Sequence, residues 1–89
     1  MALSESQLLK LTEIAQRFGA TRLILFGSLL NVDTTIRDID VACDGIVGWK
    51  LYEFGALLEK EFRIPVDVVP LSPPNPFTRA IETKGKRLL

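Results

Sequence analysis

Two aspartates separated by a single residue, Asp38 and Asp40, are the part of this 89-residue chain best suited to chemistry. Side chains of a strand alternate between its two faces, so a strand here turns both carboxylates the same way and points Ile39 and Val41 into the core. The aliphatic residues around the pair are typical of an interior strand, where charge is costly without a compensating ion. Paired carboxylates suit hard cations that prefer oxygen ligands, such as Mg²⁺.

A glycine and a serine, Gly27 and Ser28, stand at the end of an apolar strand expected over Arg22–Phe26, and nine residues separate them from Asp38. Gly27 lets the backbone approach a ligand closely, and Ser28 offers a hydroxyl and an amide to a phosphate oxygen. A hairpin-like return would bring this turn beside the acidic end of the second strand. Each feature has a plainer alternative: an ordinary turn for the Gly-Ser pair, and a solvated strand edge for the aspartates.

A third carboxylate, Asp67, interrupts an otherwise apolar segment over residues 64–69 that is expected to form a strand. Neighbouring strands of a sheet lie about 4.8 Å apart. If this strand pairs with the second, Asp67 can therefore converge on Asp38 and Asp40.

The ordered combination of Phe26-Gly27-Ser28, a spacer and Asp38-Ile39-Asp40 resembles the signature of the minimal nucleotidyltransferases, small members of the polymerase-beta-like superfamily. The segment Val66-Asp67-Val68-Val69 resembles the strand that carries the third carboxylate of this family. Residues 81–89 resemble its usual ending. The resemblance thus extends over about residues 8–89.

This resemblance implies a small single-domain α/β nucleotidyltransferase fold, with helices packed on a mixed β-sheet. It also implies transfer of a nucleoside monophosphate, AMP from ATP, to an acceptor hydroxyl, with pyrophosphate leaving. In the two-metal scheme, Asp38, Asp40 and Asp67 would be the catalytic carboxylates that hold Mg²⁺ with the nucleoside triphosphate. Gly27 and Ser28 would bind its phosphates.

Minimal members of this family commonly pair with a small helical HEPN protein in toxin-antitoxin modules. The resemblance therefore implies an antitoxin whose partner is a HEPN-like protein, or a second copy of the chain in a homodimer. One alternative is a catalytically weak or inactive subunit that neutralises its partner by direct contact. Another is a structural domain with a chance acidic pair.

The loop after the Gly-Ser pair departs from the family pattern. Its spacer is one residue short, Leu29 and Leu30 stand where a polar residue and a glycine are usual, and Arg37 stands where serine is expected. The carboxylates thus match the family better than the phosphate loop does. The two leucines predict a surface that docks a protein, and the alternative is that they fold back into the core.

Two local patterns predict where the first and last helices begin. Ser4 with Gln7 three residues later predicts a capping box for the first helix. Asn75 before Pro76 predicts the cap and first turn of a last helix over residues 77–83. With the strands, these helices indicate a small α/β domain.

A second helix is expected within residues 47–62, because apolar residues recur there at helical spacing. The residues expected to face the core are Val47, Leu51, Phe54, Leu58 and Phe62. Trp49 and Tyr52 fall off that face. They either cover the core or stack on a base.

Composition limits the remaining possibilities. The length suits one domain over residues 1–89, and eleven basic residues balance eleven acidic ones without a run of like charge, so nucleic acid is not an expected partner. No apolar run approaches the length of a membrane span, and the single Cys43 with no signal pattern indicates a cytoplasmic location. The absence of histidine removes imidazole-dependent triads and leaves chemistry based on carboxylates and metal ions.

Overall fold

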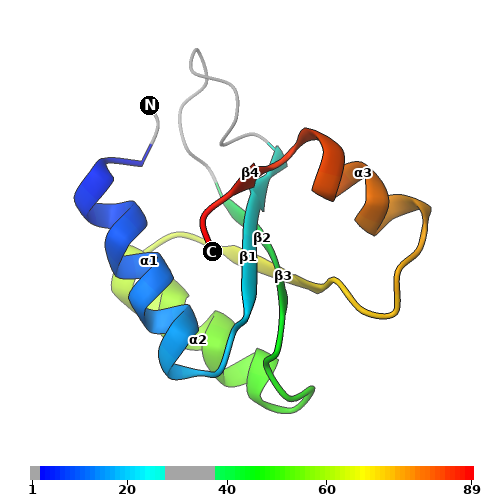
Figure 1. Cartoon of the computed structure of the whole chain (residues 1–89). Helices are drawn as coiled ribbons and strands as arrows, with labels where there is room; N and C mark the ends of the chain where they lie inside the picture. The colour runs from blue at the N-terminus through cyan, green and yellow to red at the C-terminus, as the bar shows by residue number, and fades with distance from the viewer. Residues whose placement is uncertain (1–2, 28–37) are drawn as a thin grey trace.

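The computed structural model describes residues 3–27 and 38–89, which contain three helices and four strands (Figure 1). In chain order these are α1 (Glu5–Arg17), β1 (Arg22–Phe26), β2 (Ile39–Asp44), α2 (Lys50–Phe62), β3 (Val66–Pro70), α3 (Pro76–Lys84) and β4 (Lys86–Arg87). None of the helices described is both long enough and apolar enough to cross a membrane.

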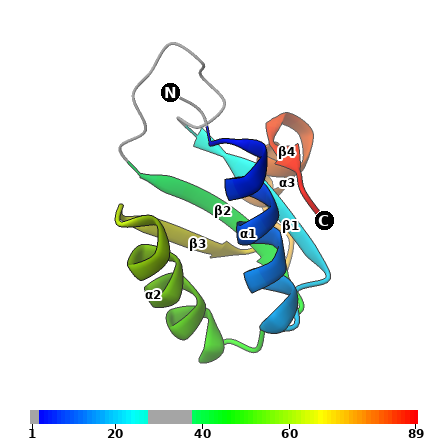
Figure 2. The same cartoon turned by 90° about the vertical axis from the view of Figure 1, so that its left-hand side faces the viewer.

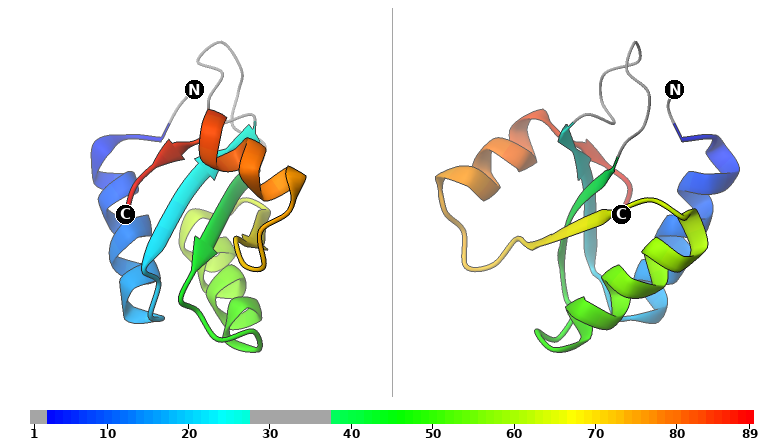
Figure 3. Two further views of the ribbon diagram at one scale, coloured as in Figure 1. Left: turned by 45° about the vertical axis from the view of Figure 1, so that its right-hand side comes forward. Right: turned by 180° about the vertical axis from the view of Figure 1, so that it is seen from behind.

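The four strands form one mixed sheet in the order β3-β2-β1-β4. β1 pairs antiparallel with β2 and with β4, whereas β2 and β3 are parallel. A parallel pair needs a crossover connection, and α2 provides it. Helices α1 and α2 lie on one face of the sheet and α3 lies on the other (Figures 2 and 3). The expected α/β fold with a mixed sheet and packed helices is confirmed.

The two central strands, β1 and β2, are buried on both faces because their apolar side chains alternate between two clusters. The larger cluster joins the sheet to α1 and α2; its fully buried members include Leu11, Leu23, Ile39, Val41, Phe54 and Leu58. The smaller cluster lies under α3 and consists of Ile24, Ala42, Leu71 and Ile81. Thus α3 packs on the sheet face opposite the larger cluster.

Both predicted helix starts are confirmed. The Ser4 Oγ accepts a hydrogen bond from the Gln7 backbone N–H at 3.2 Å, and the Ser4 N–H donates to Gln7 Oε1 at 2.8 Å. The Asn75 side chain accepts from the Thr78 N–H at 2.9 Å, and Pro76 follows as the first residue of α3. Capping residues act over three positions of the chain, which makes them readable from sequence.

One expectation about the elements is wrong, and one strand was not predicted. Val47 is 57% exposed rather than part of the core, because the turn after β2 delays the start of α2 until Lys50. Strand β4 was not expected, because Lys86 and Arg87 are both charged and exposed, and only their backbone pairing with β1 makes them a strand.

Arg22 links three elements through ion pairs. Its Nη2 lies 2.6 Å from Asp44 Oδ2 on β2, and its Nη1 lies 2.8 Å from Glu82 Oε1 on α3. The Arg22 guanidinium, and a hydrogen bond with Ser72, hold the pKa of Asp44 below its usual range. The pairs are partly exposed, so solvent screening keeps their contribution to stability modest.

We expect Arg22→Gln to lower the free energy of unfolding at neutral pH. A carboxyl whose pKa is depressed on folding contributes stability above its unfolded pKa, about 3.9, and that stability is lost as pH falls through the folded pKa. Urea unfolding across a pH series should therefore show the difference between wild type and variant vanishing in acid. A difference that persists in strong acid would mean that the effect comes from packing rather than from the Asp44 charge.

Candidate metal-binding site

The three predicted carboxylates converge at one place on the sheet. Asp40 on β2 and Asp67 on β3 are register partners in the parallel pair, and Asp38 lies just before β2. Each of the three residues offers a carboxylate oxygen, and these oxygens all lie within 4.8 Å of one another. Asp67 thus joins the pair because α2 carries the chain back to a parallel strand.

Gly27 follows β1 and lies directly against this cluster. Its φ of +75° is in the left-handed region that glycine adopts most easily. A Cβ built on Gly27 would overlap the Oδ2 atom of Asp40 and lie 3.1 Å from the Asp40 Cγ atom. The missing side chain therefore makes room for the Asp40 carboxylate, a role that the sequence did not indicate. Ser28 lies outside the described residues, as do Leu29, Leu30 and Arg37.

The cluster concentrates negative charge. Burial raises the pKa of Asp40, and the charges of Asp38 and Asp67, with a hydrogen bond shared with the Asp67 carboxyl, raise it further. The donor set consists of carboxylate oxygens from strand positions, which fits hard cations such as Mg²⁺. The residues present therefore fit the metal that the sequence pattern predicts.

We expect Asp67→Asn to leave the metal-free protein at least as stable as the wild type. The change removes a like charge near Asp40, so the pKa of Asp40 should fall towards its ordinary value. NMR titration of the Asp40 carboxyl, together with thermal melting in EDTA, measures both effects. A large loss of stability without metal would instead mark Asp67 as a structural hydrogen-bonding residue.

Two aromatic residues near the cluster had no expected role. Phe26 is the register partner of Asp40 across the antiparallel β1–β2 pair, so the two side chains share a face of the sheet. Phe77 on α3 packs edge to face against Phe26, with ring centroids 5.9 Å apart. The sequence placed Phe26 in the motif and Phe77 in the last helix, but only the sheet register brings Phe26 beside Asp40, and only the position of α3 brings Phe77 against Phe26.

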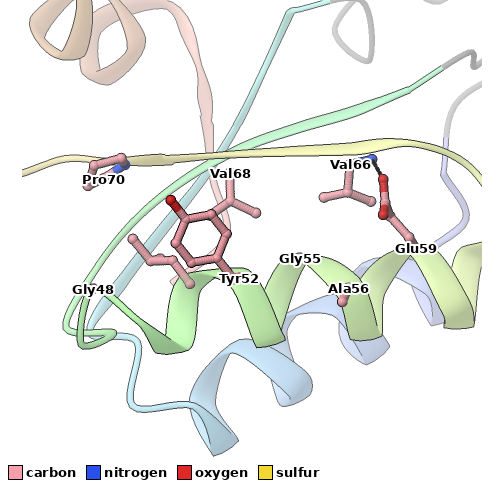
Figure 4. A pocket seen from close by; sticks show the side chains of 9 residues that line it. Gly48, Tyr52, Gly55, Ala56, Glu59, Val66, Val68 and Pro70 are labelled. Atoms are coloured by element: carbon pink, nitrogen blue, oxygen red, sulfur yellow. Dashed lines mark hydrogen bonds between the residues drawn. The ribbon is translucent and has the colours of Figure 1, made fainter.

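The two aromatics that the sequence offered for base stacking lie elsewhere. Tyr52 projects from α2 over an open groove of about 480 Å³ between α2 and β3 (Figure 4). The groove is lined by Gly48, Leu51, Tyr52, Gly55, Ala56, Glu59, Val66, Val68 and Pro70. Since Val66 and Val68 alternate with Asp67, this groove is on the sheet face opposite the carboxylates. Trp49 stands at the start of the same helix and is 63% exposed.

Neither the protein-family models nor the curated proteins give a match to this sequence. Solved structures do match. A chain of an MntA toxin-antitoxin complex with two aspartates, two positions apart, replaced by glutamate has a TM-score of 0.79 at 19% identity, covering 92% of this chain and 72% of that one. A chain of a toxin-antitoxin complex with AMP-PNP gives 0.78 at 21% identity, covering 92% and 72%.

A further match is a chain of the complex between a tri-AMPylated HEPN toxin of Shewanella oneidensis and its MNT antitoxin. Its TM-score is 0.72 at 22% identity, and the alignment covers 92% of this chain and 68% of that one. At such identities the likeness establishes a shared fold. The resemblance seen in the sequence is thus confirmed for the fold of the minimal nucleotidyltransferase antitoxins.

Proposed function

We propose, from the nucleotidyltransferase fold that it shares with these antitoxin chains, that the protein is a metal-dependent nucleotidyltransferase. It would move AMP from ATP to an acceptor hydroxyl and release pyrophosphate. Its setting would be a toxin-antitoxin pair, with this chain as the antitoxin and a small helical HEPN-like protein as partner, or with a second copy of the chain. Residues 1–89 would act as one cytoplasmic domain.

The observation that carries this proposal is the convergence of three carboxylates, those of Asp38, Asp40 and Asp67, beside Gly27. Only a residue without a Cβ can stand so close to the Asp40 carboxylate. Burial first, and then the nearby charges of Asp38 and Asp67, raise the pKa of Asp40, so in the metal-free protein its charged form is unfavourable. A cluster that disfavours its own charges is what a site for a divalent cation needs. The AMP-PNP in one similar structure and the AMPylated toxin in another support the choice of nucleotide and reaction.

Each residue has a distinct task in the proposed reaction. Asp38 and Asp40 would hold Mg²⁺ together with the triphosphate. Asp67 would lie on the side where the acceptor hydroxyl enters and would help to orient that hydroxyl. When bound, the metal would neutralise charge that develops on the phosphates and on the leaving pyrophosphate. Gly27 keeps the Asp40 carboxylate in place, and with Ser28 it would bind the phosphates.

Calorimetry with the purified protein tests the proposal directly. We expect ATP with Mg²⁺ to bind and ATP with EDTA not to bind, because the carboxylates alone would repel the triphosphate. Mixing the protein with labelled ATP, Mg²⁺ and a HEPN partner should then transfer label to the partner. Binding that is equal with and without Mg²⁺ would contradict a metal-dependent site.

A second candidate function follows from the loop sequence. Because Leu29 and Leu30 replace residues that the family uses around phosphate, the chain would then be an inactive subunit that neutralises its partner by contact. Co-purification with the partner, without any heat of MgATP binding, would favour this alternative. Loss of neutralisation when ATP or Mg²⁺ is withdrawn would favour the enzyme.

A further inference from the structure

A row of three side chains crosses the sheet face on which α3 packs. Asp67 pairs in register with Asp40, and Asp40 pairs in register with Phe26, so β3, β2 and β1 each contribute one residue to the row. Neighbouring strands are about 4.8 Å apart. The row therefore passes from two carboxylates to an aromatic ring within one strand spacing. Figure 3 shows α3 over this face, above β1 and β2.

Helix α3 extends the aromatic end of the row. Phe77, in its first turn, meets Phe26 at an interplanar angle of 86°. Phe77 is 56% exposed although its helix packs firmly, with Thr78 1% exposed in the first turn and Ile81 4% exposed against the sheet. A large apolar ring that remains open to solvent on a fixed element is a surface suited to binding.

We propose that Phe77, held edge to face by Phe26, forms a stacking platform for the nucleobase of the triphosphate that Asp38 and Asp40 would hold through Mg²⁺. This inference rests on the proposed function. A nucleotide has anionic phosphates at one end and a flat aromatic base at the other. The row likewise has a cation-binding group of carboxylates at one end and aromatic rings at the other. Stacking accepts any base, since every base has a π-face. The platform therefore predicts similar affinities for MgATP and MgGTP, and weaker binding of inorganic tripolyphosphate.

The other exposed aromatics do not offer this arrangement. Tyr52 is on α2 and Trp49 is the residue just before it, and α2 packs on the sheet face opposite the carboxylates. Tyr52 is 84% exposed and so can be changed with little effect on packing. It therefore provides a matched control: an exposed ring on a helix, remote from the proposed nucleotide.

Calorimetry with two ligands, MgATP and Mg-tripolyphosphate, tests the platform. Phe77→Ala should weaken MgATP binding about tenfold, which corresponds to about 1.4 kcal/mol, and leave tripolyphosphate binding unchanged. Phe77→Trp should keep the MgATP affinity of the wild type, because it restores an aromatic face. Tyr52→Ala should match the wild type with both ligands.

Alanine also removes the contact with Phe26, so Phe77→Leu serves as a second variant that keeps apolar volume without an aromatic face. It too should lose MgATP affinity selectively. Equal weakening of both ligands in the Phe77 variants, or equal wild-type affinities for both ligands, would overturn the platform alone. Failure of the wild type to bind either ligand would overturn the proposed function and the platform with it.

Discussion

Replacing Asp38 and Asp40 together by asparagine should abolish Mg²⁺-dependent ATP binding and any AMP transfer. Asparagine preserves size but removes two charges from a cluster whose oxygens lie within 4.8 Å of one another. Mutation of residues that only orient metal ligands already costs about 10–100-fold in metal affinity. Loss of two ligand charges should therefore weaken MgATP binding by more than about 100-fold, as isothermal calorimetry can measure.

The fold should survive this double change, because like charges are removed and a neutral amide at position 40 is less costly to bury than the Asp40 carboxylate. Thermal melting in EDTA should show equal or higher stability. A matched control removes two carboxylates elsewhere: Glu13→Gln on α1 with Glu53→Gln on α2, both exposed. If the control loses MgATP affinity as much as the double aspartate variant, net charge rather than the cluster governs binding.

Gly27→Ala should have the second largest effect, on both the site and the stability. A Cβ at this position would overlap Asp40 Oδ2, and the φ of +75° costs an L-residue about 1–2 kcal/mol. The Asp40 carboxylate must move, so the three-oxygen arrangement is lost. We expect urea denaturation to show a loss of about that size and MgATP binding to become undetectable.

Gly48→Ala is the control for this experiment, since a Cβ at Gly48 meets no atom within 4 Å. It should bind MgATP as the wild type does. If Gly27→Ala melts at lower temperature yet binds MgATP with unchanged affinity, the close approach to Asp40 matters only for the fold.

The sequence revealed the parts of this structure that depend on neighbours along the chain. Ser4 and Asn75 act over three residues, so their capping roles can be read directly. The alternation of Asp38 to Val41 likewise indicates a strand with its carboxylates on one face. Convergence of Asp67 was conditional on strand pairing, which only the parallel β2–β3 register decides.

Features that arise from distant contacts could not be read in this way. Lys86 and Arg87 carry no strand pattern and become β4 only by pairing with β1. Gly27 was attributed to the approach of a ligand, whereas the space beside it is taken by Asp40, 13 residues later in the sequence. The contact of Phe77 with Phe26 depends on where α3 packs on the sheet. In each case the contact partner is distant in the sequence, so the local residue pattern does not identify it.

Strand β3 is an edge strand of the sheet, so the charge of Asp67 also affects the solubility of the protein. Among the residues described, β3 pairs only with β2, and the Glu59 carboxylate accepts the N–H of Val66 at its start (Figure 4). An outer strand rich in valine favours edge-to-edge association between molecules, which a charge near its start and a proline at its end discourage. Asp67 and Pro70 stand in those two places. The Asp67 carboxylate would thus also discourage aggregation, so we expect Asp67→Asn to aggregate more readily than the wild type even where its thermal stability is equal or higher.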